Sequence, residues 1–271
     1  MATLAGIDVG LTLVTPTSGV CRTGQAGFVL DHVYSDRYSR EAALGTSTFD
    51  VLAVDGPVLP GSQLNYAPRI CEKIFVWNPF QTRCKPGESH VPGTGRALRR
   101  GGCDTAWQWH REVSGAALSA PFPRVWPDKN IVEAFPNGFL GVLLPTGAVG
   151  RLSRGEKFDA LYDACGAQGM WAALSAILKW TDSKLFESLP VTTDHDERAA
   201  LVCALTALCV WKGRYVAVGE PQGGYLFLPP WSLWAPWAKA GLDQNRKDRR
   251  LTGEADVWID GRQFRVGSPL P

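Results

Sequence analysis

The sequence predicts an α/β fold with a mixed sheet at its centre. Residues 4–10, 49–56 and 130–136 are expected to be buried strands because their apolar residues are nearly continuous. Segments with helical spacing separate and follow them, which is the alternation of an α/β domain. Because a charge in a buried strand is costly without compensation, we expect the carboxylates of these strands to form one cluster. The three carboxylates are Asp8, Asp55 and Glu133.

Length and composition place the chain among globular proteins. Its 271 residues allow one large domain or two small ones, and 45% apolar residues are enough for a core. The net charge of +2 gives no overall field that would favour nucleic acid or a membrane. No apolar run approaches the roughly 18 residues of a membrane span, and the chain enters its first strand without room for a leader. The seven cysteines are scattered without close pairs. We therefore expect a reduced, cytoplasmic protein with no membrane partner.

The first part of the chain predicts an antiparallel meander followed by a helix. Residues 11–17 and 26–34 are two further strand candidates, and consecutive strands with short links pair antiparallel. Residues 36–45 predict a short helix that ends at Gly45. The second acid-bearing strand follows, so the acid-bearing strands can lie side by side in one sheet.

Residues 57–128 form a long segment that is rich in Pro, Gly, Arg and Trp and has little periodicity. Connections of this length are uncommon in compact domains and are often functional. We interpret the segment as an insertion over the edge of the sheet where the acids emerge. Because arginine presents a bidentate donor fork to phosphate, its arginines are predicted substrate contacts, with a solvated basic surface as the alternative. These predicted contacts are Arg69, Arg83, Arg99 and Arg100.

The same insertion contains residues with zinc-binding chemistry. Structural zinc sites usually contain closely spaced ligand pairs, and the spacings here lack them. This set is therefore only a minor candidate for a metal site. Its members are Cys71, Cys84, His90 and Cys103.

A buried helix with acids at its start is predicted later in the chain. Residues 199–211 are apolar on nearly all sides, so we expect this helix to pack against the sheet. Asp194 and Glu197 fit a capping box, in which Asp194 accepts from the amide of Glu197. Asp196 is not needed by this box and is the preferred candidate ligand, with Asp194 second. His195 is either a proton carrier or a solvated residue of the first turn.

The remaining segments predict one more helix and two hairpins. Residues 157–180 have helical spacing that is weakened by glycines in the middle, and residues 214–230 and 257–264 have the pattern of hairpins. The chain after residue 230 is rich in Trp and then basic. We therefore divide the chain into a domain of residues 1–230 and a C-terminal extension of residues 231–271.

Acids on three strands and at one helix start indicate divalent-metal chemistry. Two metal ions about 3.5–4 Å apart can stabilise both the attacking and the leaving oxygen of a phosphoryl displacement. Such hard cations need several carboxylates from rigid elements. The alternative is that these acids cap loops or pair with the arginines of the insertion. The predicted catalytic acids are Asp8, Asp55, Glu133 and Asp196, and the predicted metal ligands are Asp8, Asp55, Asp196 and Asp194.

Six short motifs occur in a fixed order along the chain. They are Gly6-Ile-Asp-Val-Gly10, Val54-Asp-Gly-Pro57, Arg69-Ile-Cys-Glu72, Val132-Glu-Ala-Phe-Pro136, His195-Asp-Glu-Arg-Ala-Ala-Leu-Val-Cys-Ala-Leu205 and Gly224-Tyr-Leu-Phe-Leu-Pro229. In this combination they resemble the predicted RNase H-like nuclease family, long catalogued as a domain of unknown function. The resemblance covers about residues 4–230 and leaves the extension uncovered.

The resemblance implies a ribonuclease H-like fold. Such a fold has a mixed five-stranded sheet with its first three strands antiparallel and with flanking helices, and the insertion would follow the fourth strand. The resemblance also implies that Asp8 and Asp55 are metal ligands and that Asp196, together with Asp194, supplies the carboxylate of the last helix. Glu133 is a less direct match, because the better-known nucleases of this fold place their acids differently.

The leading hypothesis is a Mg²⁺- or Mn²⁺-dependent nuclease that hydrolyses phosphodiester bonds of a nucleic acid or nucleotide. An actin-like phosphotransferase or ATPase is an alternative, because such enzymes also begin with a strand carrying Asp-x-Gly, although they need two such domains. A non-catalytic nucleic-acid-binding module with the same fold is the third hypothesis. Its binding would be sensitive to salt and indifferent to acid-to-amide substitutions.

Overall fold

A computed structural model describes most of the chain. The described residues are 2–10, 12, 14–24, 27–45, 49–58, 68–84, 89–110, 130–150, 157–180, 183–221, 223–248 and 255–271, without the side chains of residues 94, 107–110, 130 and 183. The chain within these ranges is a mixed α/β structure, as the sequence predicts.

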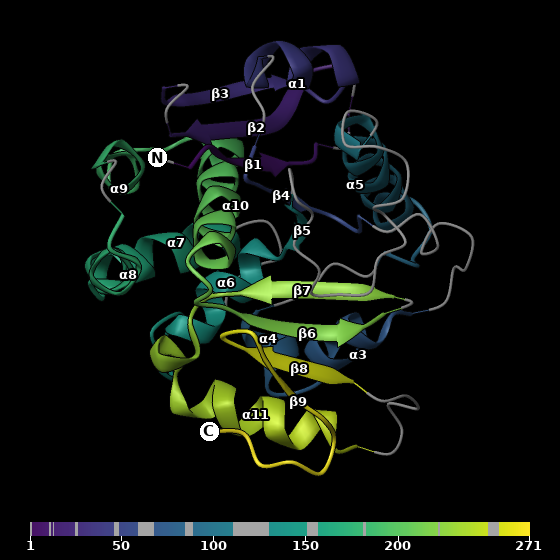
Figure 1. The fold of residues 1–271 in the computed structure, drawn as a ribbon, viewed down its shortest axis with the longest axis vertical. Coiled ribbons are helices and arrows are strands. Elements are labelled where there is room, and N and C mark those ends of the chain that lie inside the picture. Colours follow the sequence, from purple (N-terminus) through teal and green to yellow (C-terminus); the bar gives the residue numbers. More distant parts are fainter. Residues whose placement is uncertain are drawn as a thin grey trace.

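The described strands form one nine-stranded sheet in the order β3-β2-β1-β4-β5-β7-β6-β8-β9, which runs from top to bottom in Figure 1. Strands β1, β4, β5 and β7 are parallel, and the strands outside them on both sides pair antiparallel. The bounds are β1 (Leu4–Asp8), β2 (Pro16–Thr23), β3 (Val29–Tyr34), β4 (Val51–Asp55), β5 (Asn130–Ala134), β6 (Val216–Glu220), β7 (Gly224–Leu228), β8 (Asp256–Ile259) and β9 (Arg262–Phe264).

The predicted sheet of five strands is therefore wrong in its strand number. Both predicted hairpins form, as β6–β7 and β8–β9, and they do not stand apart from the sheet. Strand β7 pairs with β5 through Glu133 and Leu226, and β8 pairs with β6. In a five-stranded sheet, β5 would have one unpaired edge. Here β7 pairs with that edge and so protects its backbone hydrogen-bonding groups.

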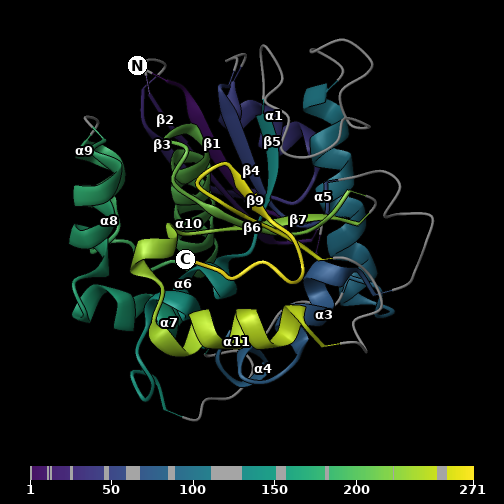
Figure 2. The same cartoon turned by 60° about the horizontal axis from the view of Figure 1, so that its bottom comes forward.

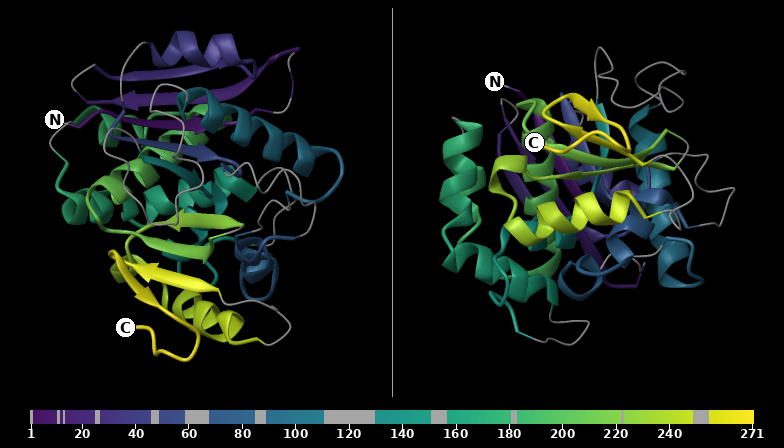
Figure 3. Two further views of the ribbon diagram at one scale, coloured as in Figure 1. Left: turned by 45° about the vertical axis from the view of Figure 1, so that its right-hand side comes forward. Right: turned by 90° about the horizontal axis from the view of Figure 1, so that it is seen from below.

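Helices cover both faces of the sheet. One face carries α6 (Pro136–Leu143), α7 (Lys157–Ala167), α8 (Met170–Leu178), α9 (Ser183–Ser188) and α10 (His195–Trp211). The other face carries α1 (Arg37–Leu44), α3 (Ile70–Val76), α4 (Phe80–Arg83), α5 (Thr94–His110) and α11 (Pro236–Arg246), preceded by the short η3 (Trp231–Leu233). Figures 2 and 3 show α8 and α9 on one side of the strands, with α5 and α3 on the other.

The N-terminal elements confirm one prediction and shift another. Helix α1 forms as predicted, since the Asp36 side chain accepts from the amide of Ser39, and Gly45 follows the helix with φ +68°. The second strand begins only at Pro16 and not at residue 11.

The predicted single helix over 157–180 is two helices, because Gly169 adopts a left-handed conformation with φ +71° between them.

The insertion contains more regular structure than the sequence predicts. Helices α3, α4 and α5 all lie within residues 57–128, whereas residues 59–67, 85–88 and 111–129 are outside the described chain. The first two helices are seven and four residues long, too short for a clear period in the sequence. Ile74, Phe75 and Phe80 are fully buried there, and Asn245 of α11 donates to the carbonyl of Ile74 at 2.8 Å. The insertion thus packs against the C-terminal extension.

Two glycines bring α10 very close to the sheet. A Cβ atom on Gly6 of β1 would lie 2.2 Å from the amide nitrogen of Ala204, and one on Gly19 of β2 would lie 1.8 Å from the carbonyl oxygen of Asp196. Any side chain at either position would therefore force the helix outward. The helix is buried over most of its length, as predicted, and its first turn lies over Gly19.

Substitution of Gly19 by alanine is expected to displace the start of α10. The atom that the new methyl group would meet belongs to the backbone and cannot rotate away, so we expect a loss of about 1–3 kcal/mol in the free energy of unfolding. Chemical denaturation measures this loss. Gly150→Ala is the control, because a Cβ atom there would have no heavy atom of the described residues within 4 Å. Equal stability of the two variants would contradict the close approach of α10 to β2.

Candidate functional site

Asp8 and Asp55 lie side by side at the carboxyl ends of β1 and β4. The two strands are parallel, and their register pairs Asp8 with Asp55 directly. Paired residues on neighbouring strands point to the same face, so both side chains emerge on the face that α10 covers. Both residues are only partly buried. The structure thus brings together the first two predicted acids.

The start of α10 adds Asp196 to this pair. Asp194 is the N-cap, and its Oδ1 atom accepts from the amides of Asp196 and Glu197 at 3.0 Å each. The sequence predicted this cap, in which the side chain of Asp196 takes no part. Asp196 lies close enough to Asp8 for its charge to raise the pKa of that carboxyl. Asp8 therefore has Asp55 on one side and the start of α10 on the other, whereas among the described residues the ligand atoms that are all mutually close belong to His32, Asp194 and Asp196.

His32 of β3 completes the cluster, and the sequence reasoning missed it. Its Nε2 atom lies 2.8 Å from Oδ2 of Asp196, outside hydrogen-bond geometry, and its Nδ1 atom lies 3.4 Å from Oδ2 of Asp194. One ligand atom from each of His32, Asp194 and Asp196 lies within 4.8 Å of the other two, so this group could hold a metal ion. His32 pairs in register with Gly19, whose missing side chain leaves the space that the start of α10 occupies. No sequence motif marks this position, because it depends on strand pairing.

Burial is the main cause of the raised pKa values of Asp8 and Asp55. Burial raises the pKa of Asp8 well above its usual range, and the negative charges of Asp55 and Asp196 raise it further. Burial, followed by the charge of Glu133, raises the pKa of Asp55 to about 7, although a hydrogen bond with Asp8 opposes this change. Holding several carboxylates together in this way is unfavourable unless protons or a cation compensate their charge.

His195 follows the N-cap residue, and its side chain contacts α7. Its Nδ1 atom lies 2.8 Å from Oδ2 of Asp159 in α7, and about half of its side chain is exposed. Arg198 also bonds to Asp159, at 3.0 Å. These contacts attach the first turn of α10 to α7, and they hold the acid-bearing end of the helix in place.

Glu133 does not join the aspartates. The register of β4 and β5 pairs it with Val54, whereas Asp55 pairs with Ala134. Because side chains alternate along a strand, Glu133 emerges on the opposite face from Asp55. There its two carboxylate oxygens each accept from Arg69 at 2.6 Å. The sequence pattern placed the acids at strand ends but could not fix the face of each one.

Arg69 is fully engaged in a buried network. Besides Glu133 it bonds to Oε1 of Glu72, at 2.8 and 3.0 Å, and to the carbonyl of Gly223 at 3.0 Å. The side chains of the three charged residues are at most 5% exposed. Burial raises the pKa of Glu133 even though Arg69 opposes it. The guanidinium of Arg69 therefore has no free edge for a phosphate.

The other three predicted substrate contacts occupy different environments. Arg99 is 2% exposed, and burial together with the charge of Arg69 lowers its pKa. Arg100 is exposed on α5. Arg83 lies at the end of α4, where its guanidinium stacks on Trp237 at 4.2 Å from the ring centroid. The four arginines therefore do not form one surface.

A small hollow adjoins Asp55 on the Glu133 side. Glu72 and Ser89 belong to its lining, and the amide of Ser89 donates to Oε1 of Glu72 at 3.1 Å. Within the described residues, Oε2 of Glu72 is buried and accepts no hydrogen bond. Because unsatisfied buried polar atoms are costly, this oxygen can accept from a polar group or a water molecule. The lining is Asp55, Gly56, Pro57, Arg69, Glu72, Ser89, Leu98, Glu133, Ala134, Phe135 and Leu226.

The cysteine-containing set does not assemble into a metal site in the described part of the chain. The group of metal-binding side chains found there is the one around His32, and none of the four candidates belongs to it. Cys71, Cys84 and Cys103 are buried. Burial raises the pKa of Cys84 to about 12 and also raises that of Cys71, so both thiols stay protonated and are poor ligands. His90 lies 3.9 Å from Glu72.

Two general findings complete the description of the site. Within the described ranges, no helix has both the length and the apolar character needed to cross a membrane. Comparisons with protein-family models, with curated proteins and with solved structures give no significant match to this chain.

Proposed function

We propose that the chain has a ribonuclease H-like fold and is a divalent-metal-dependent nuclease. The observation that carries the proposal is the aspartate cluster, in which Asp8 and Asp55 are adjacent on parallel strands and Asp196 reaches Asp8 from α10. Phosphodiester hydrolysis needs carboxylates that hold hard cations from rigid elements. The first five strands in the order β3-β2-β1-β4-β5, with β1, β2 and β3 antiparallel, support the proposed fold.

The residues of the cluster fit Mg²⁺ or Mn²⁺. Asp8, Asp55, Asp194 and Asp196 offer hard oxygen ligands, and Asp194 and Asp196 belong, with His32, to the group of mutually close ligand atoms. A cation there would also compensate the charges that raise the pKa of Asp8. His32 adds an imidazole beside Asp196, a nitrogen ligand that a first-row transition-metal ion such as Mn²⁺ accepts more readily than Mg²⁺ does. A bound ion of this kind would polarise a phosphoryl oxygen and lower the pKa of its water.

The remaining residues position the ligands. Asp194 caps the helix that carries Asp196, and His32 lies against both acids. Gly19 lets this helix end approach the strand ends. The Arg69–Glu133 pair supports β5 from the opposite face, next to the hollow at Asp55. The polar wall of that hollow is suited to orient a substrate group near the cluster.

A metal titration combined with a cleavage assay tests the proposal. We expect millimolar Mn²⁺ to raise the melting temperature of the wild-type protein, by more than Mg²⁺ does, because metal binding relieves the repulsion among the acids. Single- and double-stranded DNA and RNA should then be tested for cleavage with each metal and with EDTA. Cleavage that needs the metal supports the proposal.

The alternatives give different results in the same experiments. ATP turnover without cleavage would favour a phosphotransferase, although the described strands form one sheet and not the two domains of an actin-like enzyme. Salt-sensitive oligonucleotide binding without cleavage or any metal-dependent change in melting temperature would favour a binding module. Either result would overturn the nuclease proposal.

A further inference from the structure

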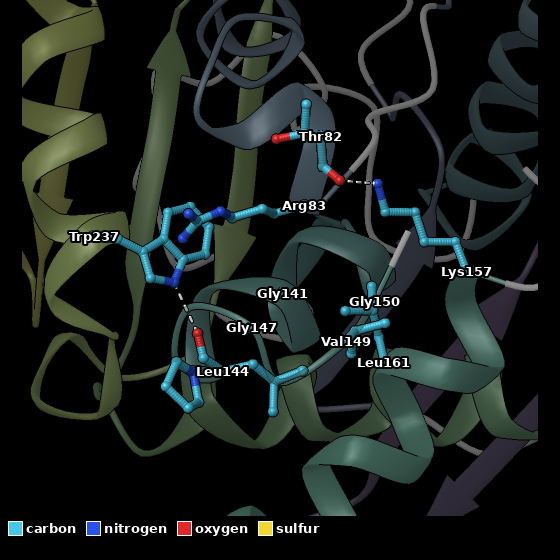
Figure 4. A pocket seen from close by; sticks show the side chains of 11 residues that line it. Thr82, Arg83, Gly141, Leu144, Gly147, Val149, Gly150, Lys157, Leu161 and Trp237 are labelled. Carbon is cyan, nitrogen blue, oxygen red and sulfur yellow. Dashed lines mark hydrogen bonds between the residues drawn. The ribbon is translucent and has the colours of Figure 1, made fainter. Parts of the chain in front are cut away.

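A second hollow lies between α4, α6, α7 and α11, and it shares no lining residue with the aspartate cluster (Figure 4). Its empty volume is about 410 Å³, including its open mouth. Two of its lining residues, Arg83 and Lys157, are cationic, and none of the described lining residues is acidic. The lining is Thr82, Arg83, Gly141, Leu144, Pro145, Gly147, Val149, Gly150, Lys157, Leu161 and Trp237.

Arg83 is held in place but not neutralised. Its guanidinium lies over the ring of Trp237, and its Nη1 atom donates to Oγ1 of Thr146 at 3.1 Å. The ring of Trp237 is itself fixed, because its Nε1 atom donates to the carbonyl of Leu144 at 2.8 Å. Within the described chain, no carboxylate forms an ion pair with Arg83. Its planar donor fork is therefore oriented in advance and keeps its charge available.

Lys157 faces the hollow from the first residue of α7. Its Nζ atom donates to the carbonyl of Thr82, as the dashed line in Figure 4 shows. No described carboxylate pairs with it either. Burial lowers its pKa, which is the change expected for a partly desolvated cation that lacks a counter-charge. A bound anion would reverse this change.

Three glycines contribute to the lining of this cavity. Residues 145–150 follow α6, and a Cβ atom on Gly147 or Gly150 would have no heavy atom of the described residues within 4 Å. A Cβ atom on Gly141 would lie 2.6 Å from the sulfur of Cys84, so close packing against α4 favours glycine at this position. Arg83 and Lys157 therefore line a cavity to which the glycine positions add no side chain.

We propose that this hollow is a phosphate-binding site, with Arg83 as the bidentate donor and Lys157 as the point charge. Arginine and lysine commonly bind the oxyanions of phosphate in these two ways. The ligand is a phosphate group, supplied either by a free phosphate compound or by a nucleic-acid backbone. The site does not depend on the nuclease proposal, because it uses neither the aspartate cluster nor a metal.

Binding is tested in EDTA with pyrophosphate as the probe, at constant ionic strength. We expect 10 mM pyrophosphate to raise the melting temperature by about 2–4 °C through mass action. The double variant Arg83→Gln/Lys157→Gln should lose this increase. The matched control Lys179→Gln/Arg262→Gln removes the same charge at two exposed residues outside the hollow and should keep it. No increase in the wild type, or an equal increase in the double variant, would overturn the proposal.

A second measurement needs no variant. Amine acetylation followed by mass spectrometry reports the reactivity of Lys157 in the wild-type protein, with exposed Lys179 as the internal reference. Pyrophosphate should slow acetylation of Lys157 at least about threefold, because a bound anion blocks Nζ and raises its pKa. Equal slowing of both lysines, or of neither, would contradict the site.

An oligonucleotide distinguishes the two sources of phosphate. If a 12-nucleotide single strand in EDTA binds the double variant at least about fivefold more weakly than the control variant, the phosphate belongs to a nucleic-acid backbone. If both variants bind the strand equally and only the pyrophosphate response is lost, the ligand is a free phosphate compound. Both results support the phosphate site.

Discussion

Substitution of Asp8 by asparagine is expected to abolish metal-dependent cleavage. The amide removes one anionic ligand from the centre of the cluster, and losing one electrostatic stabiliser of a transition state typically costs roughly 10²–10³-fold in rate. The variant should also lose the metal-dependent increase in melting temperature. Asp104→Asn is the matched control, because Asp104 is exposed on α5, on the opposite face of the sheet. Full activity of Asp8→Asn would refute the proposed metal site.

The same variant is expected to be more stable than the wild type without metal. Burial, followed by the charges of Asp55 and Asp196, raises the pKa of Asp8 well above its usual range in the folded protein, whereas an unfolded chain releases this proton near pH 4. Metal-free wild-type protein therefore loses stability as the pH rises above about 4. An amide at position 8 can donate to the neighbouring carboxylates and removes the repulsion.

Denaturation curves at pH 4 and pH 8 in EDTA measure this effect. We expect Asp8→Asn to exceed the wild type by about 1–3 kcal/mol in the free energy of unfolding at pH 8 and to match it at pH 4. Saturating Mn²⁺ should reverse the order at pH 8, because only the wild type gains binding energy. A variant that is less stable than the wild type at pH 8 in EDTA would show that the cluster is not under electrostatic strain.

Substitution of Arg69 by methionine is expected to cause the largest loss of stability. It leaves Glu133 and Glu72 buried without their shared cation, and breaking a buried pair by removing one partner typically costs about 3–5 kcal/mol. Denaturation at pH 7 measures the loss. Arg37→Met is the matched control, because Arg37 forms an exposed ion pair with Glu41 within one helix, and such a pair contributes about 0.3–0.5 kcal/mol.

A further variant separates the buried charge from the packing around it. Arg69→Met combined with Glu72→Gln and Glu133→Gln removes all three charges, and we expect it to recover part of the lost stability. If Arg69→Met lowers the free energy of unfolding by no more than Arg37→Met does, the guanidinium of Arg69 does not stabilise the buried network. Its predicted role as a substrate contact would then regain support.

The sequence alone determined the α/β class, both hairpins, the α1 helix and the cap at Asp194. These features depend on local patterns: apolar runs that form strands, a cap followed by a buried helix, and turn residues between paired strands. The same patterns placed Asp8 and Asp55 at strand ends, and parallel pairing in register brings them together. Local rules were sufficient here because each feature involves residues that are close in sequence or strands that end at one edge.

Only the tertiary structure decided which face each acid occupies and which groups surround it. Glu133 resembles Asp55 in its sequence context, yet one residue of register places it on the opposite face with Arg69. His32 joins the cluster only because β3 pairs with β2 opposite Gly19. Side chains alternate between faces at every residue, so the membership of the site depends on register, which the sequence pattern does not specify.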